Sequence, residues 1–419
     1  MTRIVEIPNR ERIDAEVFIP GSKSITNRAL VIGALADGAT RLTNWLRCED
    51  TAVMIECLEK LGFTVTPGEK GLEIAGRAGK IPLNRAELRT ANSGTTMRFL
   101  TGLVSLGRGE YTMDGSPRMR QRPIGDLLEG LQSLGVEAFS RNGDGCPPVT
   151  VRAAGLKGGE CELSGEISSQ FLTALLLIAP YAEEAATIKI RGELVSRPYV
   201  DMTLRMMADF GAGVEEKING VFTISPRTYR GREYAIEGDA SSASYFLAAA
   251  AITGGRMKIL NVGMKSIQGD AGFARLLERM GAKVQTGPDW TEVSGQLVRG
   301  IKTDLNDMPD MVPTLAAAAL FTPGRTVINN VANLRHKECD RLSAMATELK
   351  KIGARAEELP DGLIVEGGDL HGAEIETYND HRIAMAFALA GLRIPGIKIR
   401  DPGCVAKTFP DFFDAFLAL

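Results

Sequence analysis

Cationic and hydroxyl side chains gather at the start of an apolar stretch near the N-terminus. Residues 20–30 read PGSKSITNRAL, which places Lys23, Ser24 and Arg28 at the beginning of a predicted helix. A turn and small polar residues at a helix start leave backbone N–H groups that can bind an anion. The spacing differs from the GxxxxGK[ST] loop that cradles nucleotide phosphates. The stretch predicts a phosphate or carboxylate site, although a helix cap with two solvated cations would look the same.

Further cations lie at other predicted helix starts. The segment PRMRQRPIG includes Arg122, the segment RHKECDRL carries Glu338 and Arg341, and Lys407 lies in AKTFPD. Taken singly, each cation is explained by a solvated loop, and Glu338 with Arg341 by a routine helical ion pair. Asp310, beside a proline at a helix start, is in a position that is more often an N-cap than a catalytic base.

The elements that carry these residues recur as a sixfold repeat. Polar residues, an apolar helix, a glycine turn and a strand follow one another at steps of about 70 residues, too long for a solenoid repeat. The six helix starts are marked by Ser24, Ser93, Ser168, Ser241, Met311 and His381. In five copies the second helix is predicted to end at a left-handed glycine, namely Gly62, Gly135, Gly211, Gly281 and Gly353.

Equivalent helix starts in a set of small α/β units are expected to converge on one cleft. Each helix N-terminus contributes roughly half a positive charge, which would suit a polyanionic substrate. The turn signals at residues 19–21 and 237–239 are the predicted crossing points between two domains of three repeats each. The predicted domains are residues 1–19 with 238–419, and residues 20–237.

Composition narrows the class of protein. The chain has 419 residues, 44% hydrophobic and 24% charged, and a net charge of −3, which argues against nucleic-acid binding. Six scattered cysteines without a CxxC pair predict reduced thiols, and three histidines make a metal centre unexpected. No apolar run reaches the roughly 18 residues of a membrane span. The charged N-terminus carries no signal or transit peptide, and we expect a cytoplasmic protein.

Nine motifs, taken together, resemble the 5-enolpyruvylshikimate-3-phosphate synthase family. They are PGSKSITNRAL, NSGTTMR, PRMRQRPIG, ISSQFLTALL, LVSRPYVD, GDASSASYF, RHKECDRL, YNDHR and AKTFPD, and they follow the family's order from Pro20 to Asp411. No single motif is decisive, whereas the set is specific. The resemblance implies an α/β fold of two inside-out barrel domains, with the active site in the cleft between them.

The implied reaction transfers the enolpyruvyl group of phosphoenolpyruvate to the 5-hydroxyl of shikimate 3-phosphate and releases phosphate, without a metal or organic cofactor. A tetrahedral intermediate forms and collapses, so the site needs a proton donor, a base and cations for two phosphates and two carboxylates. The implied partners are these small molecules, with no nucleic acid and no membrane, and we expect a monomer. The implied pathway is aromatic amino-acid biosynthesis.

The resemblance carries roles onto individual residues. The implied catalytic residues are Lys23, Asp310 and Glu338. The implied shikimate 3-phosphate contacts are Lys23, Ser24, Arg28, Ser168, Ser169, Gln170, Ser196, Tyr199, Asp310, Asn333 and Lys337. The implied phosphoenolpyruvate contacts are Lys23, Asn92, Gly94, Arg122, Gln170, Arg341, Arg382 and Lys407.

Three positions depart from the family's commoner residues. Leu334 stands where many relatives carry Trp, Thr26 replaces Ser, and Phe99 replaces Pro just beyond the helix start at Gly94. Gly94 leaves room in the pocket and favours inhibition by the family's phosphonate inhibitor glyphosate, whereas the bulk of Phe99 could shift that helix. We expect sensitivity.

Two related enzymes and a binding protein are the alternatives. UDP-N-acetylglucosamine enolpyruvyl transferase carries Lys-Asn after the first glycine turn and usually a loop cysteine. Here Ser24 follows Lys23, and residues 116–123 contain no cysteine. An RNA 3′-phosphate cyclase shares a related repeat but needs RNA affinity, which the acidic net charge disfavours. A non-catalytic module is disfavoured because Lys23, Asp310, Glu338 and Lys407 are present together.

Overall fold

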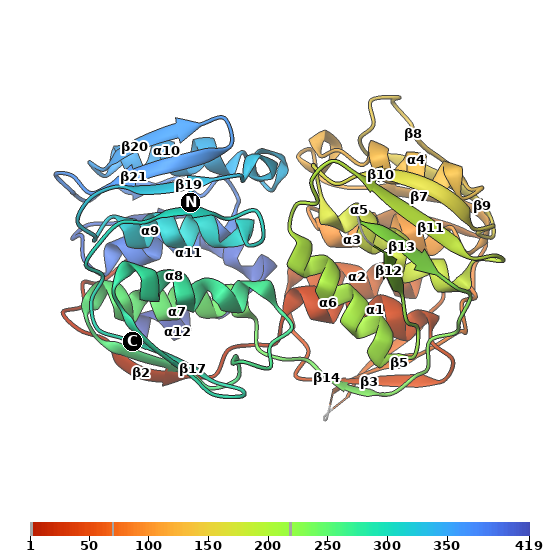
Figure 1. The fold of residues 1–419 in the computed structure, drawn as a ribbon, viewed down its shortest axis with the longest axis horizontal. Coiled ribbons are helices and arrows are strands. Elements are labelled where there is room, and N and C mark those ends of the chain that lie inside the picture. The colour runs from red at the N-terminus through yellow and green to blue at the C-terminus, as the bar shows by residue number, and fades with distance from the viewer. Residues whose placement is uncertain (1–2, 69–70, 218–219) are drawn as a thin grey trace. The chain divides into compact units, whose positions relative to one another are not determined.

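The computed structural model describes residues 3–68, 71–217 and 220–419 (Figure 1). Its contacts divide the chain into two compact units: unit 1 is Met1–Gly21 with Glu237–Leu419, and unit 2 is Ser22–Ile236. Within the described residues, none of the helices combines the length and apolar character that crossing a bilayer requires. All six cysteines are free thiols.

The described part of unit 2 contains six α-helices and three four-stranded sheets. Their strand orders are β14-β3-β5-β4, β6-β7-β9-β8 and β10-β11-β13-β12, with the first pair parallel and the others antiparallel. The strands are β3 (Ala39–Thr43), β4 (Thr64–Gly68), β5 (Gly71–Ala75), β6 (Arg85–Arg89), β7 (Arg108–Asp114), β8 (Glu137–Ser140), β9 (Val149–Ala154), β10 (Gly159–Ser164), β11 (Ala186–Arg191), β12 (Glu215–Lys217), β13 (Val221–Ile224) and β14 (Glu233–Ala235). The helices are α1 (Lys23–Leu35), α2 (Glu49–Lys60), α3 (Gly94–Val104), α4 (Gly125–Ser133), α5 (Ser169–Ile178) and α6 (Arg197–Asp209), with 3-10 turns η1 (Met119–Gln121) and η2 (Ala179–Tyr181).

The described part of unit 1 repeats this plan, except that its third sheet has three strands. The orders are β16-β17-β15-β2, β18-β19-β21-β20 and β1-β23-β22. The strands are β1 (Ile4–Glu6), β2 (Asp14–Val17), β15 (Arg256–Ile259), β16 (Lys283–Thr286), β17 (Thr291–Ser294), β18 (Lys302–Asp304), β19 (Thr326–Asn329), β20 (Arg355–Leu359), β21 (Gly362–Glu366), β22 (Glu374–Ile375) and β23 (Lys398–Arg400). The helices are α7 (Ala240–Thr253), α8 (Phe273–Met280), α9 (Val312–Ala319), α10 (Arg341–Lys351), α11 (His381–Gly391) and α12 (Phe412–Leu417), with 3-10 turns η3 (Gly269–Gly272), η4 (Pro309–Met311), η5 (Ala332–His336) and η6 (Pro402–Lys407). The predicted α/β class and sixfold repeat are confirmed.

The first helix of each copy lies inside its unit. Helices α1, α3 and α5 of unit 2, and α7, α9 and α11 of unit 1, are buried along nearly their whole length. Beyond their first turns they carry apolar residues on all sides, as interior helices do. Several strands alternate exposed and buried residues, as β6 does, which turns one face of the sheet to the helices and the other to solvent. Figure 1 shows the sheets on the outside of each unit, which is the inside-out arrangement expected.

The second helices end as predicted. The five glycines that follow them are left-handed, with φ of 88° at Gly62, 88° at Gly135, 93° at Gly211, 118° at Gly281 and 87° at Gly353. A side chain is strained at such φ values, so glycine lets the chain leave each helix for its next strand.

Two strands pair with partner strands that are distant in the sequence. Strand β2 precedes α1 but pairs in parallel with β15 of unit 1. Strand β14 pairs in parallel with β3, and the Asn44 side-chain amide donates to the Ile236 carbonyl at 2.8 Å, 192 residues away. Helix α1 therefore begins directly after the chain enters unit 2.

Candidate active site

One guanidinium gathers three carboxylates in unit 1. Arg341 donates from Nη1 to Asp310 at 2.9 Å, from Nη2 to Glu338 at 2.8 Å, and from Nε to Asp380 at 2.7 Å. Arg382 donates to the other oxygen of Asp310 at 2.7 Å. These residues, with Lys407, are called the Arg341 cluster below.

The ends of four segments position this cluster. Arg341 begins α10, and Glu338 lies in the turn just before it. Asp310 lies in η4 and Lys407 ends η6, each held by a short 3-10 turn. Asp380 caps α11, accepting from the Arg382 backbone N–H at 2.9 Å, so α11 also places Arg382. Asp310 is thus not the N-cap of α9, and its side chain is directed to the two arginines.

Burial strengthens the electrostatic interactions among these charged groups. The side chains of Arg341, Glu338 and Asp380 are 2%, 8% and 0% exposed. Burial alone lowers the pKa of Arg341, but its three carboxylate partners outweigh burial and raise the pKa above the ordinary arginine value. Lys407 Nζ lies 3.8 Å from Glu338 Oε1, so three carboxylates face three cations. Such a site can hold anions and can move protons through its carboxylates.

The start of α1 forms a second cationic region, in unit 2. Ser22 caps the helix, accepting from the Ile25 N–H at 3.4 Å. Lys23, the first helical residue, has its Nζ 3.3 Å from Oδ2 of Asp50, whose side chain is 4% exposed. Asp50 lies in the first turn of α2 and fixes the direction of the lysine.

Arg28 lies one turn further along α1 and has neutral hydrogen-bond partners. Its guanidinium donates to the Thr203 hydroxyl at 2.8 Å and to the carbonyls of Ser24 and Tyr199 at 2.9 and 3.1 Å. It also lies over the Phe99 ring, with Cζ 5.4 Å from the centroid. Burial lowers the pKa of Arg28 to about 10, so its positive charge is poorly compensated and would favour a bound anion.

Two arginines flank the start of α3. Arg122 donates to the Asn92 carbonyl at 3.4 Å, and Arg98 donates to the carbonyls of Gly94 and Pro123 at 3.3 and 2.9 Å. A Cβ at Gly94 would lie 2.7 Å from Nη2 of Arg122 and 2.7 Å from Nη1 of Arg98. Glycine is therefore needed here for the close approach of both guanidinium groups.

The remaining predicted residues of unit 2 lie at the starts of α5 and α6. Ser168 caps α5, accepting from the Gln170 N–H at 3.3 Å, and Ser169 is the first helical residue. Ser196 precedes α6 in a left-handed conformation, with φ of 57°, and Tyr199 accepts from Arg28 through its carbonyl.

The predicted site residues therefore fall into two sets. Asp310, Glu338, Arg341, Arg382 and Lys407 meet in the Arg341 cluster of unit 1. Asn333 and Lys337 belong to the same unit, in and after η5. All the others belong to unit 2.

Four residues of these networks were absent from the predicted site. They are Asp50, Arg98, Thr203 and Asp380. Arg98 and Asp380 lie within the motifs NSGTTMR and YNDHR, so their place beside predicted residues was a usable signal. Asp50 and Thr203 are brought in only by the packing of α2 and α6 against α1.

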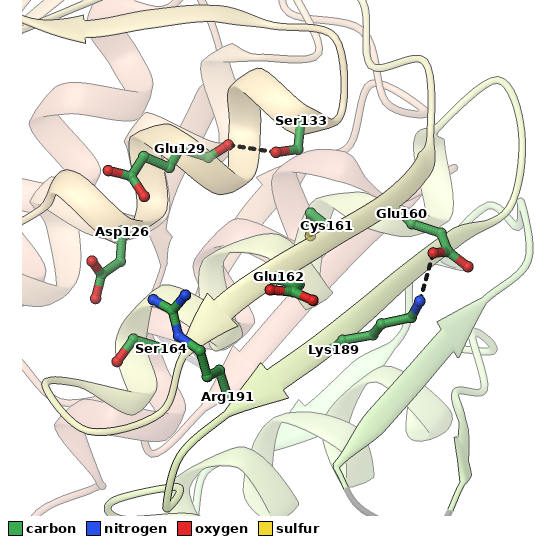
Figure 2. A pocket seen from close by; sticks show the side chains of 9 residues that line it. All are labelled: Asp126, Glu129, Ser133, Glu160, Cys161, Glu162, Ser164, Lys189 and Arg191. Atoms are coloured by element: carbon green, nitrogen blue, oxygen red, sulfur yellow. Dashed lines mark hydrogen bonds and ion pairs between the residues drawn. The ribbon is translucent and has the colours of Figure 1, made fainter.

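A separate polar cavity of about 440 Å³ lies in unit 2 between α4 and strands β10 and β11 (Figure 2). Glu160 and Lys189 form an ion pair of 2.6 Å at its edge. It is lined by Asp126, Glu129, Ser133, Glu160, Cys161, Glu162, Ser164, Lys189 and Arg191. No predicted site residue lines this cavity, and its surplus of carboxylates does not suit an anionic substrate. It is not the candidate active site.

Comparisons with known proteins agree across the chain. Residues 7–416 match the family model described as EPSP synthase (3-phosphoshikimate 1-carboxyvinyltransferase). The 3-phosphoshikimate 1-carboxyvinyltransferase of Nostoc punctiforme is 47% identical over 420 residues, with 99% of each chain covered. That of Shewanella loihica is 47% identical over 418 residues, with 97% of each chain covered. The solved EPSP synthase from Acinetobacter baumannii has a TM-score of 0.82 at 29% identity, covering 100% of this chain and 98% of that one.

Proposed function

The chain belongs to the EPSP synthase family, and on that premise we propose how its residues carry out the 3-phosphoshikimate 1-carboxyvinyltransferase reaction of the shikimate pathway. The substrates are phosphoenolpyruvate and shikimate 3-phosphate. The 5-hydroxyl oxygen of the latter bonds to C2 of phosphoenolpyruvate while a proton adds to its methylene carbon. Phosphate then leaves C2, and the methyl group gives up a proton to restore the double bond.

The shared guanidinium of Arg341 is the observation that carries the assignment of acid and base. It holds Asp310 at 2.9 Å and Glu338 at 2.8 Å, so both carboxylates lie beside one cation. Asp310 also binds Arg382 at 2.7 Å, whereas the second cation near Glu338, Lys407, lies at 3.8 Å. A carboxylate whose second cation is more distant loses less on taking up a proton. We therefore assign proton donation at the methylene carbon to Glu338 and proton removal from the hydroxyl to Asp310.

The cations divide between the two substrates. Arg122, Arg341, Arg382 and Lys407, with Asn92, Gly94 and Gln170, are assigned to phosphoenolpyruvate. Arg28, with the polar residues Ser24, Ser168, Ser169, Gln170, Ser196, Tyr199, Asn333 and Lys337, is assigned to shikimate 3-phosphate. The neutral partners of Arg28 support an anionic ligand there. Lys23, at the start of α1, is assigned to both substrates. The ion pair with Asp50 fixes the direction of its ammonium group.

Phosphate release tests the activity directly. The purified chain should release phosphate from phosphoenolpyruvate with shikimate 3-phosphate and not with UDP-N-acetylglucosamine. Ser24 after Lys23 supports that choice of acceptor. Phosphate release from phosphoenolpyruvate with UDP-N-acetylglucosamine but not with shikimate 3-phosphate would overturn the proposal. Equal rates before and after dialysis against a chelator are expected, because the proposed steps use only side chains and substrate.

Both residue sets must act on one pair of substrates for this mechanism to work. We propose that the two units correspond to the two domains of the family and close on the substrates. Small-angle scattering should show compaction when shikimate 3-phosphate is added, and unchanged scattering would count against closure. We further propose a cytoplasmic monomer, which sedimentation at several protein concentrations and cell fractionation would test.

A further inference from the structure

A strained turn lies directly before Asp380, one of the carboxylates of the Arg341 cluster. Tyr378 and Asn379 are consecutive left-handed residues without being glycines, with φ of 54° and 53°. Asparagine tolerates this conformation, whereas tyrosine does so at a cost. Such backbone persists only where the surroundings enforce it. The next residue is Asp380, which binds Arg341 and caps α11.

A buried carboxylate on α10 holds the segment that leads into this turn. Glu348 is 1% exposed and accepts from the Tyr378 hydroxyl at 2.8 Å and from the Glu376 backbone N–H at 3.1 Å. Lys351, one turn further on, balances the charge with its Nζ 2.6 Å from Oε2 of Glu348. Partial burial of its hydroxyl and the bond to Glu348 both raise the pKa of Tyr378, which is otherwise 36% exposed, so its hydroxyl remains a donor at neutral pH. Both backbone and side chain of this segment are thus tied to one carboxylate.

Helix α10 therefore holds the turn at both ends. Glu348 follows Arg341 by seven residues, which is about two helical turns and places both on one face. Arg341 binds Asp380 after the turn, and Glu348 binds Tyr378 and Glu376 at its start. The orientation of Asp380 sets the first turn of α11, because Asp380 accepts from the Arg382 N–H.

We propose that Glu348 and Tyr378 are positioning residues, which keep the turn 378–379 closed and so aim Arg341 and Arg382 at phosphoenolpyruvate. The proposal rests on the assignment of these two arginines to that substrate. Glu348 and Tyr378 act through the turn and do not touch the reacting atoms.

Kinetics on two substitutions test this role. Tyr378→Phe and Glu348→Gln should each raise the KM for phosphoenolpyruvate about 10-fold, since small misplacements of binding groups are costly. The KM for shikimate 3-phosphate should stay within about twofold, because its proposed contacts are mostly in unit 2. The matched control is Tyr111→Phe, which removes a hydroxyl bond of 2.7 Å to the Leu83 carbonyl in unit 2 that is part-buried like that of Tyr378, and which should change neither KM.

Rescue by glycine separates positioning from a general loss of packing. Tyr378→Gly loses the same hydroxyl bond and also the ring, yet it should raise the KM for phosphoenolpyruvate less than Tyr378→Phe does, because glycine takes a positive φ without strain whereas an aromatic residue does so at a cost. Two results would overturn the proposal: an unchanged ratio of the two KM values in Tyr378→Phe, or a KM for phosphoenolpyruvate in Tyr378→Gly at least as high as in Tyr378→Phe.

Hydrogen exchange keeps this proposal separate from the proposed function. In Tyr378→Phe, exchange of the backbone amides of residues 376–382 should speed up about 10-fold, while exchange within α10 itself stays unchanged. Unchanged exchange there would refute the proposal that Glu348 and Tyr378 hold the turn, even in an active enzyme. A wild-type chain that fails to turn over the two substrates would instead refute the proposed function, and the exchange result would still decide whether Glu348 and Tyr378 hold the turn.

Discussion

Two amide substitutions around Arg341 separate proton transfer from charge balance. Glu338→Gln and Asp380→Asn each remove one negative charge from the partners of the same guanidinium and keep the size of the side chain. Only Glu338 is assigned to proton transfer, whereas Asp380 is fully buried and is used by Arg341 and by the start of α11. We expect Glu338→Gln to lower kcat by at least about 10²-fold, because a general acid typically contributes 10²–10⁴-fold, or roughly 3–5 kcal/mol of barrier.

The effects on folding should run the other way. Asp380 makes two contacts with Arg341, at 2.7 and 3.3 Å, with no exposure of its side chain. Neutralising one partner of such a buried pair costs about 3–5 kcal/mol. The helix cap survives, since asparagine caps as well as aspartate. Glu338 has one contact with Arg341 and a distant one with Lys407, so its loss should cost about 1–3 kcal/mol.

The assay compares both variants at a temperature where both are folded. Phosphate release gives kcat, calorimetry gives the affinity for shikimate 3-phosphate, and urea unfolding gives stability. We expect Asp380→Asn to be the less stable protein but to lose less than about 10-fold in kcat, and both variants to bind shikimate 3-phosphate normally. Equal losses of kcat would show that the charge around Arg341, rather than a proton on Glu338, limits the reaction.

Three further predictions follow from contacts in and near the site. Gly94→Ala places a methyl group 2.7 Å from Nη2 of Arg122, so we expect a several-fold higher KM for phosphoenolpyruvate and weaker inhibition by glyphosate, both measured by phosphate release. Phe99→Leu removes the ring under Arg28, worth about 0.5–2 kcal/mol, and should weaken shikimate 3-phosphate binding by about 2- to 30-fold in calorimetry; unchanged affinity would show that the ring only fills space. Burial raises the pKa of Glu237 above 4.5, so the folded protein holds this proton more tightly than the unfolded chain, and this group's contribution to stability falls as pH rises through the raised pKa. Glu237→Gln should therefore gain stability relative to wild type as pH rises above about 4.5 in urea unfolding, and a constant difference would contradict this.

The repeat was predictable because its signals are local. A glycine after each second helix permits the left-handed backbone at that residue, and a helix with apolar residues on every face, such as α5, is expected in an interior. The completion of the sheets was not predictable in the same way. Strands β2 and β14 are short, and their partners β15 and β3 lie far along the chain, so no local pattern specifies the pairing.

The motifs supplied the candidate site residues, whereas the local geometry of those residues could not be predicted. Polar residues at helix starts predicted caps, and Ser22, Ser93 and Ser168 are caps. At the fifth start the 3-10 turn η4 frees Asp310 from capping and turns its carboxylate to Arg341 and Arg382. Such a choice between a cap and an ion pair depends on residues 31 and 72 positions away, which spacing cannot reveal.

The carboxylates that pair with the cations of the candidate site explain why a site for polyanions needs acidic as well as basic side chains. A cation removed from water is stable only with an opposite charge or several hydrogen bonds. Asp50 supplies that charge to Lys23, and Asp380 supplies it to Arg341. Arg28 uses neutral oxygens and a ring instead, and burial lowers its pKa. An incoming anion therefore gains most at Arg28, where no acid must be displaced, whereas at Arg341 it meets a guanidinium already fixed in direction by its carboxylates. The first arrangement favours affinity and the second favours alignment, which is the division expected if shikimate 3-phosphate is bound in unit 2 and the chemistry is directed from unit 1.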